Sequence, residues 1–172
     1  MRRNQAAALS DPDASERRRW PRKTTPSRAV IANADGKNAH DCVIIDISAG
    51  GAQISTSEKV PVDLQVYLLD TGNQVAYLAK ILWSNATRSG LWFLGKQPIG
   101  RGMAPCLSFL WRLLLEAKLR EVDRNLAEGV PKTLALAGAG LTPVHVQEMA
   151  QHTNGDRKFE SALLRAMSLF RK

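Results

Sequence analysis

The chain has 172 residues, of which 44% are hydrophobic and 23% charged, so it is long enough for one domain with a sizeable core plus a smaller appendage. The net charge of +8 is concentrated at the N-terminus: residues 1–28 hold eight basic and three acidic residues, residues 29–104 six of each, and residues 105–172 ten and seven. No apolar run has the roughly 20 residues of a membrane span and no apolar segment follows Arg2 and Arg3, so we expect no membrane span, no secretory signal and a cytoplasmic location.

The arrangement of reactive side chains does not indicate an enzyme. Cys42 and Cys106 form no CxxC pair and lie near no histidine cluster, so we expect neither a zinc site nor a disulfide framework. Cys42 lies in an apolar stretch and is predicted to be a small buried hydrophobe. The histidines are scattered, and no Ser/His/Asp, HExxH, Walker or GxGxxG pattern occurs. We therefore expect no catalytic residues, no metal and no cofactor.

The N-terminal arm combines disorder-prone composition with clustered arginines. Residues 1–15 are polar and aperiodic, and we expect this tail to be disordered. Pro21 disfavours helix at Trp20, so the following basic run is predicted to be extended. Arg18 and Arg22 are then up to roughly 13 Å apart, a separation that suits two parts of one anionic ligand. A solvated charge run without a ligand is the alternative.

Short strands separated by turn signals follow the arm. Asp35-Gly36 is a hairpin turn signal, and Gly50-Gly51 and Thr71-Gly72-Asn73 mark later turns. The spacing near ten residues is typical of a small antiparallel barrel. The predicted strands cover residues 27–33, 39–48, 52–56, 61–70, 75–83 and 90–95.

The strand predicted over residues 39–48 carries the polar candidates for a site. One set of alternate positions is apolar and is predicted to face the core. This set is Val43, Ile45 and Ile47. Asp46 and Ser48 fall on the other face, so we expect both to point outward.

A helical pattern begins after a Gly/Pro-rich linker over residues 97–105. Apolar residues recur at spacings of 4, 4, 3 and 4, namely Trp111, Leu115, Leu119, Val122 and Leu126. Further leucines make this helix apolar on more than one face, so we expect it to pack on the barrel, on a neighbouring subunit or on both. A homodimer through the helix at 106–128 is one such arrangement.

The remaining residues are predicted to form a loop and two short helices. Residues 132–140 are rich in Ala and Gly and are interpreted as a loop. Thr142 caps a helix that reaches about Gln151, with Pro143 at its first position. Asp156 caps a final helix with one apolar face. That face is Phe159, Leu163, Ala166, Met167 and Phe170.

The arm and the Gly-Gly turn together have the chemistry of a guanine-nucleotide site. Arg18 and Arg22 can pair bidentately with phosphate or with the O6/N7 edge of guanine. Asp46 can accept from guanine N1–H and N2–H₂, and Ser48 offers a small donor and acceptor. Gly50-Gly51 lets the backbone approach a ligand closely. Taken alone, the Asp46-Ser48 pattern could also be a simple turn motif.

These two motifs resemble those of the PilZ domain family. RxxxR is present as Arg18-Arg19-Trp20-Pro21-Arg22, and [D/N]xSxxG as Asp46-Ile47-Ser48-Ala49-Gly50-Gly51. The stretches 79–83 and 90–93 also resemble the closing strands of the family. The resemblance implies a mainly β protein: a small six-stranded antiparallel PilZ-type barrel with a flexible basic N-terminal arm and a C-terminal α-helical extension.

The resemblance also implies a bacterial second-messenger receptor that binds cyclic di-GMP. Arg18 and Arg22 would grip guanine and phosphate, and Asp46, Ser48, Gly50 and Gly51 would cradle the other edge. Arg17 could contact a second ligand molecule.

The expected organisation is a tail over residues 1–15, a PilZ-like barrel domain over 16–104 and a helical extension over 105–172. Ligand binding would order the arm and signal to a partner protein. A basic nucleic-acid-binding regulator and a PilZ-like scaffold that binds no nucleotide are the alternatives. The helices carry little charge excess, which argues against nucleic acid.

Overall fold

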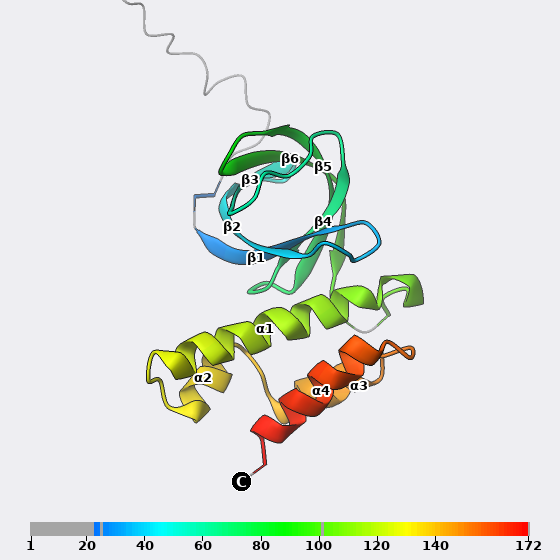
Figure 1. Ribbon diagram of the computed structural model, residues 1–172. Helices are drawn as coiled ribbons and strands as arrows, with labels where there is room; N and C mark the ends of the chain where they lie inside the picture. Colours follow the sequence, from blue (N-terminus) through cyan, green and yellow to red (C-terminus); the bar gives the residue numbers. More distant parts are fainter. Residues whose placement is uncertain (1–22, 25, 101, 172) are drawn as a thin grey trace, which may run out of the picture.

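A closed antiparallel barrel and a layer of helices make up the protein (Figure 1). The computed structural model describes residues 23, 24, 26–100 and 102–171, and the structural statements below concern those residues. The barrel has six strands in the order β1-β2-β3-β6-β5-β4, which confirms the predicted mainly β fold with a C-terminal helical extension. The strands are β1 (Ser27–Asn33), β2 (His40–Ile47), β3 (Gly51–Thr56), β4 (Gln65–Asp70), β5 (Val75–Ser84) and β6 (Arg88–Pro98).

The barrel interior is filled by alternate apolar residues from every strand. These include Ile31, Ile44, Ile54, Leu68, Ile81 and Leu91, all buried. At one end the stacked rings of Tyr77 and Phe93, with centroids 4.3 Å apart, pack against this core. The interior is therefore a packed core rather than a channel.

Two details of the strand prediction were wrong. In β2 the buried residues are Cys42 and Ile44, while Val43 is 40% exposed, so the predicted inward phase at Val43 is reversed. Strand β4 begins at Gln65 rather than at residue 61, because Asp63 takes a left-handed conformation with φ 63° that interrupts an extended chain. Cys42 is buried, as predicted.

The helical extension contains four α-helices after a short 3₁₀ turn. They are η1 (Pro105–Leu107), α1 (Phe109–Ala127), α2 (Lys132–Gly138), α3 (Pro143–Ala150) and α4 (Arg157–Leu169). The predicted caps are confirmed: the Thr142 hydroxyl accepts from the His145 amide, and the Asp156 carboxylate accepts from the amides of Lys158 and Phe159.

Helix α2 lies where a loop was predicted. Its residues Ala135 and Leu136 are buried in the same cluster as α1, so tertiary packing stabilises a segment with no clear period. The Lys118 ammonium of α1 donates to the Ala139 carbonyl at 2.7 Å, which satisfies a carbonyl at the C-terminal end of α2.

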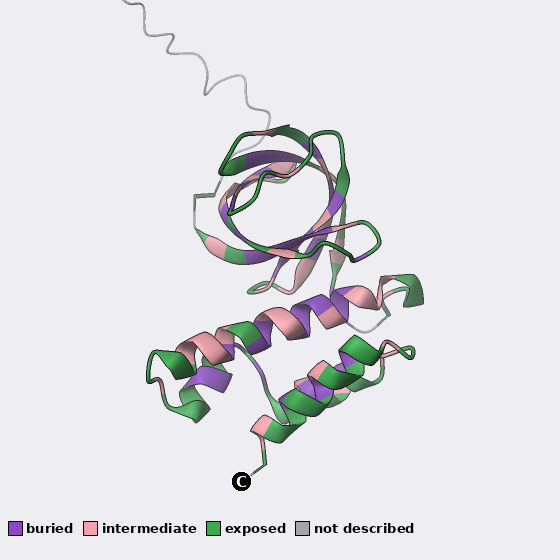
Figure 2. Ribbon diagram, viewed as in Figure 1, coloured by how far each residue is buried: buried purple, intermediate pink, exposed green. Residues whose placement is uncertain are grey.

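Helix α1 lies between the barrel and the other helices (Figures 1 and 2). Its buried leucines share one apolar cluster with barrel residues such as Val30, Ala32 and Leu69 and with residues of α2, α3 and α4. An ion pair between Arg120 and Asp41 ties α1 to β2, with N–O distances of 2.7 and 3.1 Å. The apolar residues on several faces of α1 are therefore buried within one chain. They no longer support dimerisation through this helix, which stays a prediction.

Within the described part of the chain, no helix is both long and apolar enough to cross a membrane. Among the same residues, no group of three His, Cys, Asp or Glu side chains is arranged to hold a metal ion.

Candidate functional site

The last described residue of the arm is joined to the end of β2. The Lys23 amide donates to the Ile47 carbonyl at 2.8 Å, and the Ile47 amide donates to the Lys23 carbonyl at 3.1 Å. This isolated antiparallel bridge places the chain directly after Arg22 beside the segment that contains Asp46 and Ser48. Arg17, Arg18 and Arg22 themselves lie outside the described residues.

A β-bulge determines the side on which Asp46 lies. Ile44 pairs with Ile54, but Asp46 rather than Ile45 pairs with Gln53, so Ile45 is an extra residue in β2. Ile54 is fully buried and Gln53 follows the opposite alternation, so Gln53 and Asp46 share the outer face of the barrel. The predicted outward position of Asp46 is confirmed, although the alternation used to predict it was wrong upstream of the bulge.

Ser48 closes the two-residue turn between β2 and β3. Its amide donates to the Gly51 carbonyl at 2.8 Å, and its hydroxyl donates to the same oxygen at 3.2 Å. The Gly50 carbonyl accepts from the Phe93 amide at 3.0 Å, which holds the turn against β6. The motif therefore forms a hydrogen-bonded turn, and the hydroxyl oxygen of Ser48 can still accept hydrogen bonds.

The close approach of strand β6 requires a glycine at position 51. A Cβ at this position would lie 2.2 Å from the Leu91 carbonyl oxygen of β6. Gly51 does not adopt a left-handed conformation. The structural reason for this glycine is the close approach of β3 and β6, whereas the sequence indicated an approach of the backbone to a ligand.

Two exposed indoles lie on the same outer face as Asp46. Trp92 pairs directly with Gly51, and its side chain is 51% exposed. Trp83 pairs with Gly90, where an added Cβ would lie 2.1 Å from the indole Nε1, so this ring lies across Gly90. Gly90 in turn pairs with Gln53. The sequence interpretation missed both tryptophans as members of this face, although each could have been assigned outward once the strand phase was known.

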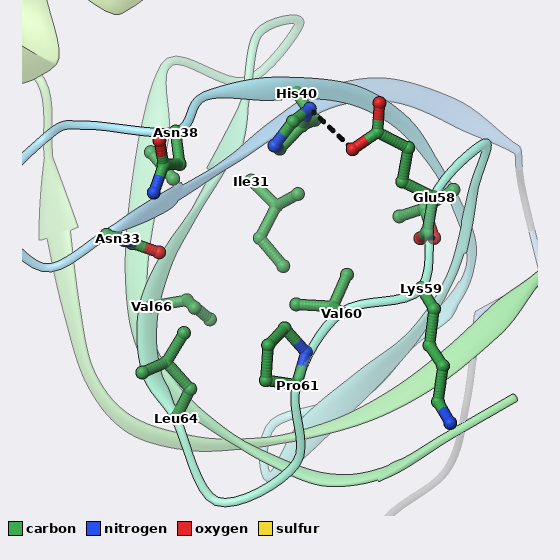
Figure 3. Close-up of a pocket in the computed structure, with 12 residues that line it drawn as sticks. Ile31, Asn33, Asn38, His40, Glu58, Lys59, Val60, Pro61, Leu64 and Val66 are labelled. Atoms are coloured by element: carbon green, nitrogen blue, oxygen red, sulfur yellow. Dashed lines mark hydrogen bonds and ion pairs between the residues drawn. The ribbon is translucent and has the colours of Figure 1, made fainter.

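A small pocket at the other end of the barrel contains none of the predicted site residues (Figure 3). Its volume is about 190 Å³, and Ile31, Val60 and Val66 form apolar walls below a rim where His40 and Glu58 lie 3.6 Å apart. A groove of about 600 Å³ runs between β1, β2 and β3 and helix α1, and Pro26 lines it. It contains Asp41 and Cys42 but neither Asp46 nor Ser48.

Comparison with known proteins identifies the family. The family model of the PilZ domain matches residues 16–101, a span that contains both sequence motifs and the whole barrel. The crystal structure of the PilZ domain of CeSA from a cellulose synthesizing bacterium is similar at 24% sequence identity, with a TM-score of 0.36, over 57% of this chain and 98% of that chain. No curated protein matches the chain. The chain belongs to the PilZ domain family, whose members are generally receptors for cyclic di-GMP and typically not enzymes.

Proposed function

We propose that this protein is a cytoplasmic receptor for cyclic di-GMP that binds the dinucleotide between its N-terminal arm and the outer face of β2 and β3. The observation that carries the proposal is the bridge between Lys23 and Ile47. It joins Lys23, the residue after the RxxxR motif, to Ile47 of the DxSxxG motif, which is 24 residues away in sequence.

The chemistry of the two motifs is complementary to a guanine dinucleotide. Arg18 and Arg22 supply planar guanidinium groups for phosphate and for the O6/N7 edge of guanine. Asp46 supplies acceptors for guanine N1–H and N2–H₂, and it lies outside the barrel where a ligand can reach it. The exposed indoles of Trp83 and Trp92 provide faces on which a purine can stack.

The proposed output is a change of the arm that a partner protein detects. Phosphates of the ligand would neutralise the clustered arginines and hold the arm across the outer face of the barrel. Arg17 is adjacent to the motif and is our candidate for contact with a second ligand molecule. The surface formed by arm, ligand and barrel would then bind the downstream protein.

Isothermal titration calorimetry with cyclic di-GMP tests the proposal. We expect clear binding by the wild type and severe loss in both variants, because Arg22→Ala removes a partner of phosphate or of guanine O6/N7 and Asp46→Ala removes the acceptor for guanine N1–H and N2–H₂. Asp35→Ala is a matched control, since it removes an exposed carboxylate that pairs with Lys37 in the turn before β2, at the opposite end of this strand from Asp46.

Thermal unfolding of the unliganded variants separates a binding defect from a folding defect. A variant that loses binding and still unfolds at the temperature of the wild type has a binding defect. Absence of binding by the wild-type protein would reject the nucleotide proposal and leave the scaffold interpretation.

A further inference from the structure

The hairpin formed by β5 and β6 displays several large apolar side chains on the outside of the barrel. Among the described residues of this hairpin, Leu82, Trp83, Trp92 and Leu94 have 52%, 43%, 51% and 48% of their surface exposed. We call these four residues the hairpin surface. Their exposure is unusual because large apolar side chains in a barrel normally alternate with polar ones that face water.

Two β-bulges create part of this exposure. The register between β5 and β6 shifts once between Ile81 and Trp83, and once where Ala79 pairs with Phe93 and Leu78 with Gly95. The extra residues are Leu82 in β5 and Leu94 in β6. A regular strand would turn either Leu82 or Trp83 inward, whereas the bulge leaves both on the outside. Both irregularities therefore add apolar area to the same face.

The helical extension does not cover the hairpin surface. The apolar cluster around α1 includes Val30, Ala32 and Leu69 of the barrel but reaches β5 only at Ala76, near its first residue. Figure 1 shows α1 running past the β1 and β4 side of the barrel. Among the residues that the structure describes, no other element covers the hairpin surface.

Charge is segregated along the barrel sequence. Residues 29–74 hold two basic and six acidic residues, whereas residues 75–104 hold four basic and no acidic residues. On the hairpin itself the basic residues are Lys80, Arg88 and Lys96, and Lys80 pairs with Asp63 at 2.9 Å. The apolar hairpin surface is therefore bordered by positive charge from Arg88 beside the turn and from Lys80 opposite Trp92, whereas Lys96 lies over the ring of Tyr77.

We propose that the hairpin surface is the docking site for an acidic amphipathic segment of the downstream partner protein. Exposed Trp and Leu side chains supply the apolar centre of such an interface, and Arg88 and Lys80 supply the charged rim. A second copy of this chain would bring the same basic residues face to face, which is unfavourable.

The proposed partner site shares Trp83 and Trp92 with the proposed nucleotide site. Trp92 lies opposite Gly51, one residue past the turn that begins with Ser48. A ligand held by Asp46 and the arm would border the hairpin surface along this edge. Control of partner binding by cyclic di-GMP thus rests on the proposed function, whereas the docking surface itself rests on exposure, bulges and charge.

Selection of displayed random peptides on the full-length protein tests the proposal. We expect enriched peptides to combine Leu, Phe or Trp with several Asp or Glu residues. A synthetic copy of such a peptide should bind at least tenfold more weakly to the double variant Leu82→Ser/Leu94→Ser and to Arg88→Glu. Leu164→Ser is the matched control, because Leu164 of α4 is a leucine with 69% exposure away from the hairpin.

Three results would overturn the docking surface: no enrichment, enrichment of basic peptides, or equal binding by the double leucine variant with unchanged unfolding temperature. Binding of the protein to phosphatidylglycerol vesicles that is lost in the same variants would assign the surface to a bilayer instead. Peptide binding that fails only in the hairpin variants, in a protein with no calorimetric response to cyclic di-GMP, would support the surface and reject the nucleotide proposal. Retained cyclic di-GMP binding by Leu82→Ser/Leu94→Ser would show that the two leucines belong to the partner surface alone.

Discussion

Asp46 lies directly opposite Gln53 on the outer face of the barrel because Ile45 is bulged out of β2. Without that extra residue in the count, Asp46 would fall opposite Ala52, whose side chain is 3% exposed. A carboxylate turned into this apolar core would lose its hydration, which costs several kcal/mol when no partner replaces the water. The bulge therefore makes an acidic residue compatible with both the folded barrel and an accessible site.

We expect Arg18→Lys to lose most of its affinity for cyclic di-GMP, although the charge is kept. Lys is a point donor and cannot reproduce the two parallel hydrogen bonds of a guanidinium with phosphate or guanine. Arg19→Lys, the same change inside the RxxxR motif but at a position that the motif leaves open, should bind like the wild type. Calorimetric titration of both variants with cyclic di-GMP tests this prediction, and equal affinities would contradict a bidentate role for Arg18.

Gly51→Ala should destabilise the barrel by about 1–3 kcal/mol, the range typical of overpacked sites. The new Cβ would meet the Leu91 carbonyl oxygen at 2.2 Å, and a backbone atom cannot move aside without shifting β6 against β3. Gly95→Ala in β6 is the control, because its Cβ would meet nothing within 4 Å. Urea unfolding measures both variants, and equal midpoints would show that β3 and β6 can separate at little cost.

The two thiols should differ strongly in reactivity. Cys106 is exposed, whereas burial raises the pKa of Cys42 from 9.0 to about 12 and holds it as the unreactive thiol. We expect one equivalent of a thiol reagent to react with the native protein at neutral pH and a second only after unfolding. Rapid reaction of both thiols in the native protein would show that Cys42 is accessible.

The same pKa shift predicts a loss of stability in alkali. The folded protein keeps the Cys42 proton at pH values where the unfolded chain releases it. This contribution to stability is complete below pH 9.0 and is lost as the pH rises towards about 12. Cys42→Ala should remove that part of the pH dependence, as measured by urea unfolding across the alkaline range.

The ion pair of Arg120 with Asp41 should couple the helical extension to the barrel weakly but measurably. Both side chains are about half exposed, so we expect a coupling energy of about 0.2–1 kcal/mol from a double-mutant cycle. High salt should reduce the coupling because the pair is accessible to solvent. A coupling energy of zero at low salt would contradict direct pairing between α1 and β2 in solution.

The barrel could be predicted from the sequence because turn residues and apolar alternation agree over most strands. The phase of β2 could not, since Cys42, Val43, Ile44 and Ile45 are all apolar and alternation alone does not choose between the two faces. The bulge at Ile45 then shifts the inward–outward alternation of β2 by one residue. Asp46 therefore lies on the outer face, as predicted. Local sequence does not encode such a shift, because it depends on pairing with Gln53 and Ala52 of another strand.

Helix α2 shows a second limit. Its sequence, KTLALAG, is too short and too uniform to show a helical period, and it is buried by residues of α1 and the later helices. The tryptophans of the candidate site show a third. Trp83 and Trp92 lie near Asp46 on the outer face only because β3 pairs with β6 rather than with β4, and strand order in a barrel is a long-range property.

The Lys23–Ile47 bridge changes the way in which a two-part ligand site can be assembled. Lys23 is held beside Asp46, so Arg22 is attached to a fixed point through a single peptide link of about 3.8 Å between Cα atoms. Its effective concentration at the barrel face is therefore set by the covalent tether rather than by diffusion. Arg18 lies four residues before Arg22, so the chain that connects it to Lys23 is longer and the entropy cost of ordering it is larger. The two arginines of one motif would then differ in what they contribute, the nearer one to affinity and the farther one to the response that a partner can sense.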